Sequence, residues 1–164
     1  MIKVTICEVL EMNVLFVCLG NICRSPMAES MFRQLVDQAG LSNKIQVDSA
    51  GTSDEEEGNP PHPGAQQTMR AHGLPITGLV SRPITQHDYA WADYIICMDN
   101  MNLYNLRRMA PVDDIAKIHL ANELVPGHEQ EEIPDPWYTH RFEDTYQSLA
   151  RALPLWLDKI ENEL

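Results

Sequence analysis

The chain has 164 residues, of which 44% are hydrophobic and 22% charged, and these values are typical of one soluble globular domain with a full core. Its formal net charge of −12 leaves no basic stripe of the kind that binds nucleic acid or an anionic membrane surface. No apolar run approaches the ~18–20 residues that cross a bilayer, and no secretory signal is recognisable, so we expect a cytoplasmic protein.

The cysteines and histidines favour neither a disulfide scaffold nor a metal site. The four cysteines are too few and too unevenly spaced for a disulfide framework, and no pair follows the CxxC spacing of a zinc site. The six histidines are scattered, with no HxxxH pair. We therefore expect no metal and no other cofactor, and the thiols remain available for packing, redox chemistry or nucleophilic chemistry.

The first strong element is a buried strand. Residues 12–18 form a nearly continuous apolar run, which is typical of a parallel strand covered on both faces. Residues 1–11 precede it without a clear pattern, and we treat them as an N-terminal extension to a single domain over 12–164. After the strand, Pro26 predicts the first turn of a helix, with Ser25 as its N-cap.

The rest of the chain alternates between strands and helices, which predicts an α/β fold. The expected elements are a strand at 45–50, a loop at 51–63, a helix at 64–72, a short helix at 85–91, a strand at 94–98, a helix at 100–109, a strand at 115–120, a loop at 121–138 and a last helix at 140–162. We expect three layers: a central four-stranded parallel sheet flanked by helices, with a phosphate-binding loop after the first strand.

Residues 18–26 read CLGNICRSP and lie between the first strand and the helix that follows it. In an open α/β sheet, ligands bind at this carboxyl end of the strands. The free N–H groups and the dipole of a helix N-terminus favour an anion there. Gly20 and Asn21 tolerate the positive φ angles that such a loop needs, and the Arg24 guanidinium can hold two phosphate oxygens at once. The pattern predicts a phosphate site.

Cys18 stands at the floor of this predicted site. The surrounding N–H groups and Arg24 would stabilise its thiolate, and Ser25 can donate a hydrogen bond to the sulfur. A thiolate inside an anion cradle is a nucleophile aimed at phosphorus. A cysteine that ends a strand is more often a small buried hydrophobic residue, and a CX5R match alone is weak evidence. Here the strand, bend, arginine, serine and proline agree, and they favour the nucleophile.

Asp135 is the candidate for the acid that such a reaction needs, because the leaving oxygen must be protonated. It lies in the segment IPDPW over residues 133–137, where two prolines stiffen the loop and apolar neighbours would favour the protonated acid. An Asp between prolines is by itself usually a turn residue. It gains weight only beside the nucleophile.

Over residues 12–164 the sequence resembles the low-molecular-weight protein tyrosine phosphatases. The signature CxGNxCRSP of this family and the late DP motif are together highly specific. The matching segments are CLGNICRSP at 18–26, DSAGT at 48–52, HGL at 72–74, MD at 98–99 and DP at 135–136.

The resemblance implies a mechanism and assigns residues to it. Cys18 would be the nucleophile and form a phosphocysteine, and Asp135 would protonate the phenolic leaving group and then activate water. Arg24 and the loop backbone would bind the phosphoryl oxygens without any metal. The loop residues concerned are Leu19, Gly20, Asn21, Ile22 and Cys23.

The same resemblance assigns supporting roles. Asn21, Ser49 and His72 match positions that hold the loop in shape, and Ser25 matches the serine that supports the thiolate. Cys23 matches a cysteine that forms a reversible disulfide with the nucleophile under oxidant, although it can equally be a packing residue.

Two departures from the family pattern concern substrate binding. Glu55 stands near a position where the family usually has an aromatic residue. It forms either an acidic wall of the cleft, which would repel acidic substrates, or part of a solvated loop that points away. Trp137 and Tyr138 follow the DP motif where two tyrosines are common, so an aromatic slot for a phenyl ring is retained.

We therefore expect a metal-independent phosphatase that acts on phosphotyrosine-containing proteins, as a monomer or weak dimer. A protein arginine phosphatase of the same family is the alternative, but such enzymes tend to carry threonine where this chain has Ile22. A thiol-relay arsenate reductase needs further downstream cysteines, and only Cys97 is available. A cysteine phosphocarrier would leave Arg24 and Asp135 without a role, and a catalytically dead phosphotyrosine-binding module is disfavoured because every catalytic position is filled.

Overall fold

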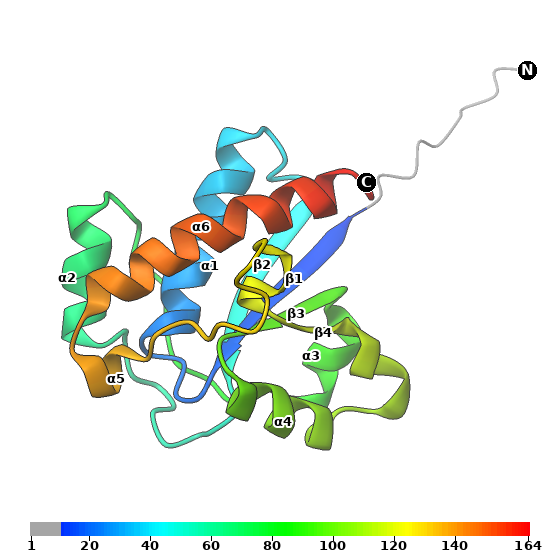
Figure 1. The fold of residues 1–164 in the computed structure, drawn as a ribbon. Coiled ribbons are helices and arrows are strands. Elements are labelled where there is room, and N and C mark those ends of the chain that lie inside the picture. The colour runs from blue at the N-terminus through cyan, green and yellow to red at the C-terminus, as the bar shows by residue number, and fades with distance from the viewer. Residues whose placement is uncertain (1–10) are drawn as a thin grey trace, which may run out of the picture.

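A four-stranded parallel sheet runs through the centre of the molecule (Figure 1). The computed structural model describes residues 11–164, so the predicted N-terminal extension lies, apart from residue 11, outside the described residues. The strand order is β2-β1-β3-β4. The strands are β1 (Met12–Cys18), β2 (Ile45–Gly51), β3 (Tyr94–Cys97) and β4 (Ile118–Leu120).

Helices cover both faces of this sheet, which confirms the predicted three-layer α/β architecture (Figure 1). One layer holds α1 (Arg24–Gln38), α2 (Pro63–Ala71) and α6 (Phe142–Glu161). The opposite layer holds α3 (Gln86–Trp91) and α4 (Asn100–Met109). No helix within residues 11–164 has both the length and the apolar character that crossing a bilayer requires.

The alternation of side chains along β1 divides the core into two clusters. Phe16 and Cys18 face the cluster beneath α1 and α6, whereas Leu15 and Val17 face the cluster beneath α3 and α4. All four side chains are buried, which accounts for the continuous apolar run in the sequence. Cys18 thus ends the strand on the face that leads into α1.

The first helix begins earlier than its proline predicts. It starts at Arg24, so Pro26 is its third residue, and Cys23 occupies the N-cap position without a side-chain cap. The prediction that Ser25 is the N-cap is therefore wrong. Its hydroxyl instead lies 3.0 Å from the Cys18 sulfur.

Two predicted stretches differ because local helical turns replace extended chain. The 3₁₀ helix η1 (Val112–Lys117) takes up the first part of the strand expected at 115–120, helped by a Lys117–Asp114 ion pair of 2.9 Å. The predicted loop at 121–138 contains η2 (Ala121–Leu124) and α5 (Pro136–Thr139). A proline at the first position of α5 favours that short helix.

Candidate active site

The loop between β1 and α1 turns its carbonyl groups away from the space that it encloses. Four of these carbonyls accept hydrogen bonds from outside the loop: Cys18 from Thr52 N (3.0 Å), Leu19 from Ser53 N (3.0 Å), Gly20 from Ser81 Oγ (2.8 Å) and Ile22 from His62 N (2.8 Å). The C=O and N–H of a trans peptide point in opposite directions. The N–H groups of residues 19, 20, 21 and 23 therefore face inward, and they form the anion cradle that the sequence predicts.

Asn21 supplies the bend of this loop. Its φ is +55°, in the left-handed region that asparagine tolerates better than most residues. The expectation that Gly20 also has a positive φ is wrong, because Gly20 is not among the glycines with positive φ. Close approach at Gly51 also matters, because a Cβ there would lie 2.7 Å from the Leu19 carbonyl oxygen.

A directional chain of hydrogen bonds leads from the buried Glu29 to the Cys18 sulfur. Ser49 Oγ donates to Glu29 Oε1 at 2.7 Å, and Asn21 Nδ2 donates to both Ser49 Oγ (3.0 Å) and Ser25 Oγ (2.7 Å). The Ser25 oxygen accepts from Asn21, so its own proton can go to the Cys18 sulfur at 3.0 Å or to the Ala50 carbonyl at 3.5 Å, of which the sulfur is the nearer. The chain thus supports a negatively charged sulfur.

Arg82 fixes the other end of the Asn21 side chain. Its backbone N–H donates to Asn21 Oδ1 at 3.1 Å, which sets the orientation of the amide. The Arg82 guanidinium is held in turn by the buried Asp88 (2.9 Å) and by Asp48 (3.0 Å). The position of the loop therefore depends on an ion-pair cluster outside it.

Arg24 is a buried cation with several partners. Its Nη2 lies 2.8 Å from Asp99 Oδ2 and 3.3 Å from Asp135 Oδ2, while Nη1 donates to the Ile133 carbonyl at 3.1 Å. Burial opposes the charge, but the neighbouring Cys18, Asp135 and Asp99 outweigh it and raise the pKa of Arg24. The guanidinium is thus held charged beside the thiol.

Asp135 lies across the pocket from the loop backbone and is fixed at both oxygens. Oδ1 accepts from the Trp137 N–H at 3.1 Å, and Oδ2 faces Arg24. The segment before it is anchored, because Ile133 N donates to the Met98 carbonyl (2.9 Å) and Thr145 Oγ1 donates to the Pro134 carbonyl (2.9 Å). The acid is therefore positioned by Met98, which follows β3, together with α5 and α6.

The described residues contain three free cysteines, which have different environments. Burial, followed by the negative charge of Cys18 and Asp135, raises the pKa of Cys23 to about 12. Burial likewise raises the pKa of Cys97 to about 12. Both are neutral thiols at neutral pH. Of the three described cysteines, Cys18 is the one whose sulfur lies within the anion cradle.

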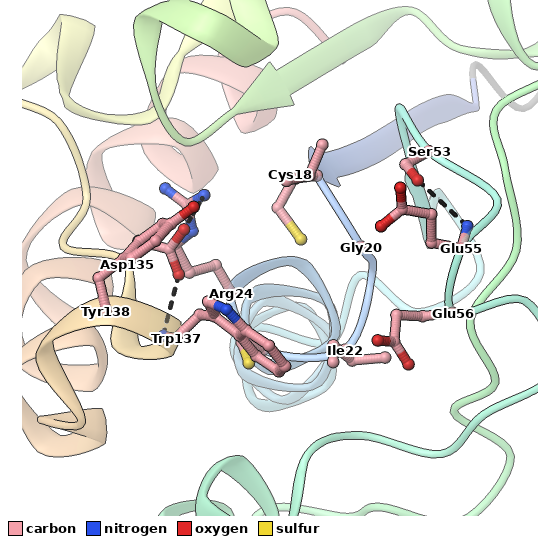
Figure 2. Close-up of a pocket in the computed structure, with 12 residues that line it drawn as sticks. Cys18, Gly20, Ile22, Arg24, Ser53, Glu55, Glu56, Asp135, Trp137 and Tyr138 are labelled. Carbon is pink, nitrogen blue, oxygen red and sulfur yellow. Dashed lines mark hydrogen bonds and ion pairs between the residues drawn. The ribbon is translucent and has the colours of Figure 1, made fainter.

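A pocket of about 210 Å³ brings most of the predicted site residues together (Figure 2). Glu55 and Glu56 lie on one side of it and Asp135, Trp137 and Tyr138 on the other, with Cys18 between them. Glu55 is exposed and lines the pocket, which favours the acidic wall over a loop that points away. The lining residues are Cys18, Leu19, Gly20, Ile22, Cys23, Arg24, Ser53, Glu55, Glu56, Asp135, Trp137 and Tyr138.

His72 lies apart from this site. It caps the C-terminus of α2, where Nε2 lies 2.9 Å from the Glu143 carboxylate and the ring stacks on Tyr146 with centroids 3.5 Å apart. The expected contact with the phosphate loop is not made. The residues that take that place are Ser81 and Arg82.

Four residues that the sequence does not single out hold the loop or Arg24. Asp99 is the second residue after β3 and the N-cap of α4, and a carboxylate just after a strand that neighbours the nucleophile's strand is a usable signal. Glu29 was a further signal, because it is an acid within the apolar pattern of α1. Ser81 and Arg82 lie in an irregular segment without any pattern that marks them.

The charge of the site comes from side chains and backbone amides. Within residues 11–164, no group of three or more His, Cys, Asp or Glu side chains is arranged to hold a metal ion. The groups that can balance a bound phosphate are Arg24 and the inward N–H groups of the loop.

Comparison with known proteins agrees with this geometry. Residues 13–164 match the family described as low molecular weight phosphotyrosine protein phosphatase. The low molecular weight protein-tyrosine-phosphatase YfkJ of Bacillus subtilis is 42% identical over 151 residues, covering 92% of this chain and 97% of the relative.

A human relative and a solved structure give the same result. The human low molecular weight phosphotyrosine protein phosphatase is 46% identical over 151 residues, covering 90% of this chain and 94% of its own. The crystal structure of YfkJ superposes with a TM-score of 0.90 at 41% identity and covers 93% of this chain and 96% of that one. The chain belongs to the low molecular weight phosphotyrosine protein phosphatase family.

Proposed function

We propose that this protein hydrolyses phosphotyrosine in proteins through a phosphocysteine intermediate, with Cys18 as nucleophile. The observation that carries the proposal is the Cys18 sulfur, 3.0 Å from the Ser25 hydroxyl, in a loop of which four carbonyls are bonded from outside. Arg24 and Asp135 line the same pocket. Nucleophile, anion cradle and acid are the three parts that phosphoryl transfer from an ester requires.

In the first step the Cys18 thiolate attacks phosphorus, and a P–S bond forms as the P–O bond to the tyrosine ring breaks. The electron pair of that bond goes to the phenolic oxygen, which takes the proton of the Asp135 carboxyl group. The charge on the three other oxygens is stabilised by the inward N–H groups and by Arg24, which is already held in place by Asp99.

In the second step a water molecule attacks phosphorus, and the Asp135 carboxylate takes its proton. The P–S bond breaks, its electron pair returns to sulfur, and inorganic phosphate leaves. The Ser25 hydroxyl, which accepts from Asn21 and lies 3.0 Å from the sulfur, can donate to the returning thiolate.

The dimensions and lining of the pocket support an aryl phosphate. Its volume of about 210 Å³ suits one phosphorylated side chain rather than a larger ligand. Trp137 and Tyr138 offer ring faces at the mouth, with exposed fractions of 54% and 75%. Ile22 adds an apolar contact and has no hydroxyl that could orient a phosphoarginine, which favours phosphotyrosine over the arginine phosphatase alternative.

The test is kcat/KM on phosphotyrosine and phosphoarginine peptides side by side, in the presence of EDTA. We expect turnover of phosphotyrosine that disappears in Cys18→Ser and persists in Cys97→Ser, the matched control. Cys97 is buried in β3 on the opposite face of the sheet from Cys18. Preference for phosphoarginine would retain the mechanism and overturn the substrate. Lack of turnover of either would overturn the proposal.

The expected setting of the enzyme follows from its thiol. A cysteine nucleophile must remain reduced, and the three described cysteines are all free, which supports a place in the reducing cytoplasm. We further propose that the protein acts as a monomer or weak dimer. Light scattering after size-exclusion chromatography, measured over a range of concentrations, tests that expectation.

A further inference from the structure

The mouth of the active-site pocket has an acidic side. Glu55 and Glu56 line it from the segment after β2, opposite Trp137 and Tyr138 (Figure 2). Among the residues that line this pocket, Arg24 is the single basic one, and it is buried and paired with Asp99 and Asp135. A substrate residue that passes over this side therefore meets negative charge that no nearby lining cation balances.

The acidic side is held in register with the phosphate loop. Ser53 N donates to the Leu19 carbonyl at 3.0 Å, and Glu55 N donates to Ser53 Oγ at 3.1 Å. Asn59 Nδ2 donates to Glu56 Oε2 at 2.8 Å, which fixes that half-buried carboxylate. The two charges thus keep a set position relative to the site of phosphate binding.

The negative charge of the acidic side acts on groups at the floor of the pocket. Glu56 is one of the charges that, after burial, Cys18 and Asp135, raise the pKa of Cys23. An ideal Cβ built on Gly20 would lie 3.4 Å from Glu56 Cγ, so this side chain packs directly over the loop. Glu55 is exposed and lies farther out, where the residues next to a bound phosphotyrosine would pass.

We propose that Glu55 and Glu56 are specificity-determining residues, and that they select phosphotyrosine flanked by lysine or arginine and reject phosphotyrosine flanked by acidic residues. The inference rests on the proposed function and names the substrate class of that site. Opposite charges across a rim raise the rate of productive encounter, and like charges lower it. The aromatic side of the mouth contacts the phenyl ring, while the acidic side interacts with the residues that flank the phosphotyrosine.

The expected effect is moderate because both carboxylates are near solvent. Each exposed ion pair contributes little by itself, and flanking glutamate adds repulsion to the loss of attraction. We expect kcat/KM to differ about tenfold between lysine-flanked and glutamate-flanked peptides at low salt. The ratio should fall toward one as NaCl rises from about 0.05 M to about 1 M, because screening weakens interactions between exposed charges.

The experiment compares three peptides of one sequence in which both neighbours of the phosphotyrosine are lysine, glutamine or glutamate. The readout is the ratio of kcat/KM for the lysine and glutamate peptides, so changes in overall activity cancel. We expect the double variant Glu55→Gln/Glu56→Gln to lower that ratio to about twofold or less. Glutamine keeps the size of each side chain, and circular dichroism with thermal unfolding verifies the fold.

The matched control is Glu57→Gln, which removes one charge from the same loop. Glu57 is exposed and does not line the pocket. Because the whole chain carries a net charge of −12, a general attraction for basic peptides is expected as well. The control measures how much the loss of one charge outside the pocket changes this general attraction. We expect Glu57→Gln to retain the wild-type ratio.

The outcomes separate this inference from the proposed function. Equal turnover of all three peptides by the wild type would overturn the inference and leave the phosphatase intact. A ratio that persists in the double variant, or that falls equally in Glu57→Gln, would assign the selectivity to the overall field and also overturn it. Failure to turn over any phosphotyrosine peptide would overturn the proposed function itself.

Discussion

The floor and the rim of the pocket are built in opposite ways. The floor consists of the phosphate loop with Arg24, whose side chain is 3% exposed and has three polar partners. At the rim, Trp137 and Tyr138 are exposed, and the Trp137 indole has one aromatic neighbour, His62, with centroids 6.0 Å apart. The floor is therefore rigid before substrate arrives, whereas the aromatic side of the rim is free to adjust.

This difference separates chemistry from selection. Groups that stabilise a transition state are most effective when they need no rearrangement, and the buried hydrogen bonds of the floor provide that condition. Groups that read a protein substrate must be accessible to it. Changes in the floor should therefore lower kcat by orders of magnitude, and changes in the rim should alter KM by small factors.

The largest effect is expected at Arg24. In Arg24→Lys the planar fork is lost, so one ammonium cannot hold Asp99 and the Ile133 carbonyl and also offer two donors to a phosphate. We expect kcat to fall about 10²- to 10³-fold. The measurement is steady-state kcat on free phosphotyrosine. The control is Arg70→Lys, an exposed arginine of α2 that contacts Gln66 outside the pocket, and a loss of similar size there would contradict the assignment.

Asp135 should give the next largest effect, and its size should depend on the leaving group. In Asp135→Asn the amide oxygen can still accept from the Trp137 N–H, so the local turn is kept while the proton donor is lost. We expect kcat to fall about 100-fold for phosphotyrosine, and much less for an aryl phosphate whose leaving group needs no proton. Similar losses across a series of leaving groups would show that Asp135 is not the acid.

The ion pair between Asp88 and Arg82, which supports the phosphate loop from outside, should affect stability in a way that depends on pH. Burial alone would raise the pKa of Asp88, but hydrogen bonds from Arg82 and Thr85 outweigh it and hold that pKa below its ordinary value. A lowered pKa stabilises the folded state above the unfolded pKa of about 4, and this contribution is lost as the pH falls through the folded value.

We therefore expect Asp88→Asn to lower the free energy of unfolding by about 1–3 kcal/mol at neutral pH. Because asparagine does not titrate, the difference from wild type should shrink as the pH falls below about 4. Urea unfolding at several pH values measures it. Asp48→Asn is the control, since that carboxylate is half exposed and should contribute less. A difference that stays constant down to pH ~3 would contradict the role of the Asp88 charge.

The sequence predicts the floor better than what surrounds it, and the reason is physical. Cys18, Arg24 and Asp135 each lie in a local pattern: an apolar strand, a CX5R loop and a proline-flanked acid. Ser81 and Arg82 act through contacts that span about 60 residues, in a segment with no periodicity. Such long-range contacts leave no mark on the local sequence.

Two errors have the same origin. Pro26 predicts a start of α1 at Ser25 or Pro26, but the folded loop extends the helix back to Arg24. The family resemblance predicts that His72 supports the loop, whereas the fold carries it to Glu143 and Tyr146 on α6. In both cases tertiary packing decides what the local pattern leaves open.

The smallest effect is expected at the rim, at Trp137. Removing the indole in Trp137→Ala takes away one aromatic wall but leaves Cys18, Arg24 and Asp135 in place. An aromatic contact contributes about 0.5–1.5 kcal/mol, so KM for phosphotyrosine should rise about two- to tenfold while kcat changes little. Trp137→Phe should recover most of the loss, because a ring face is restored. If kcat fell with KM unchanged, Trp137 would act on the placement of Asp135 through the α5 turn, and the division between floor and rim would not hold at this residue.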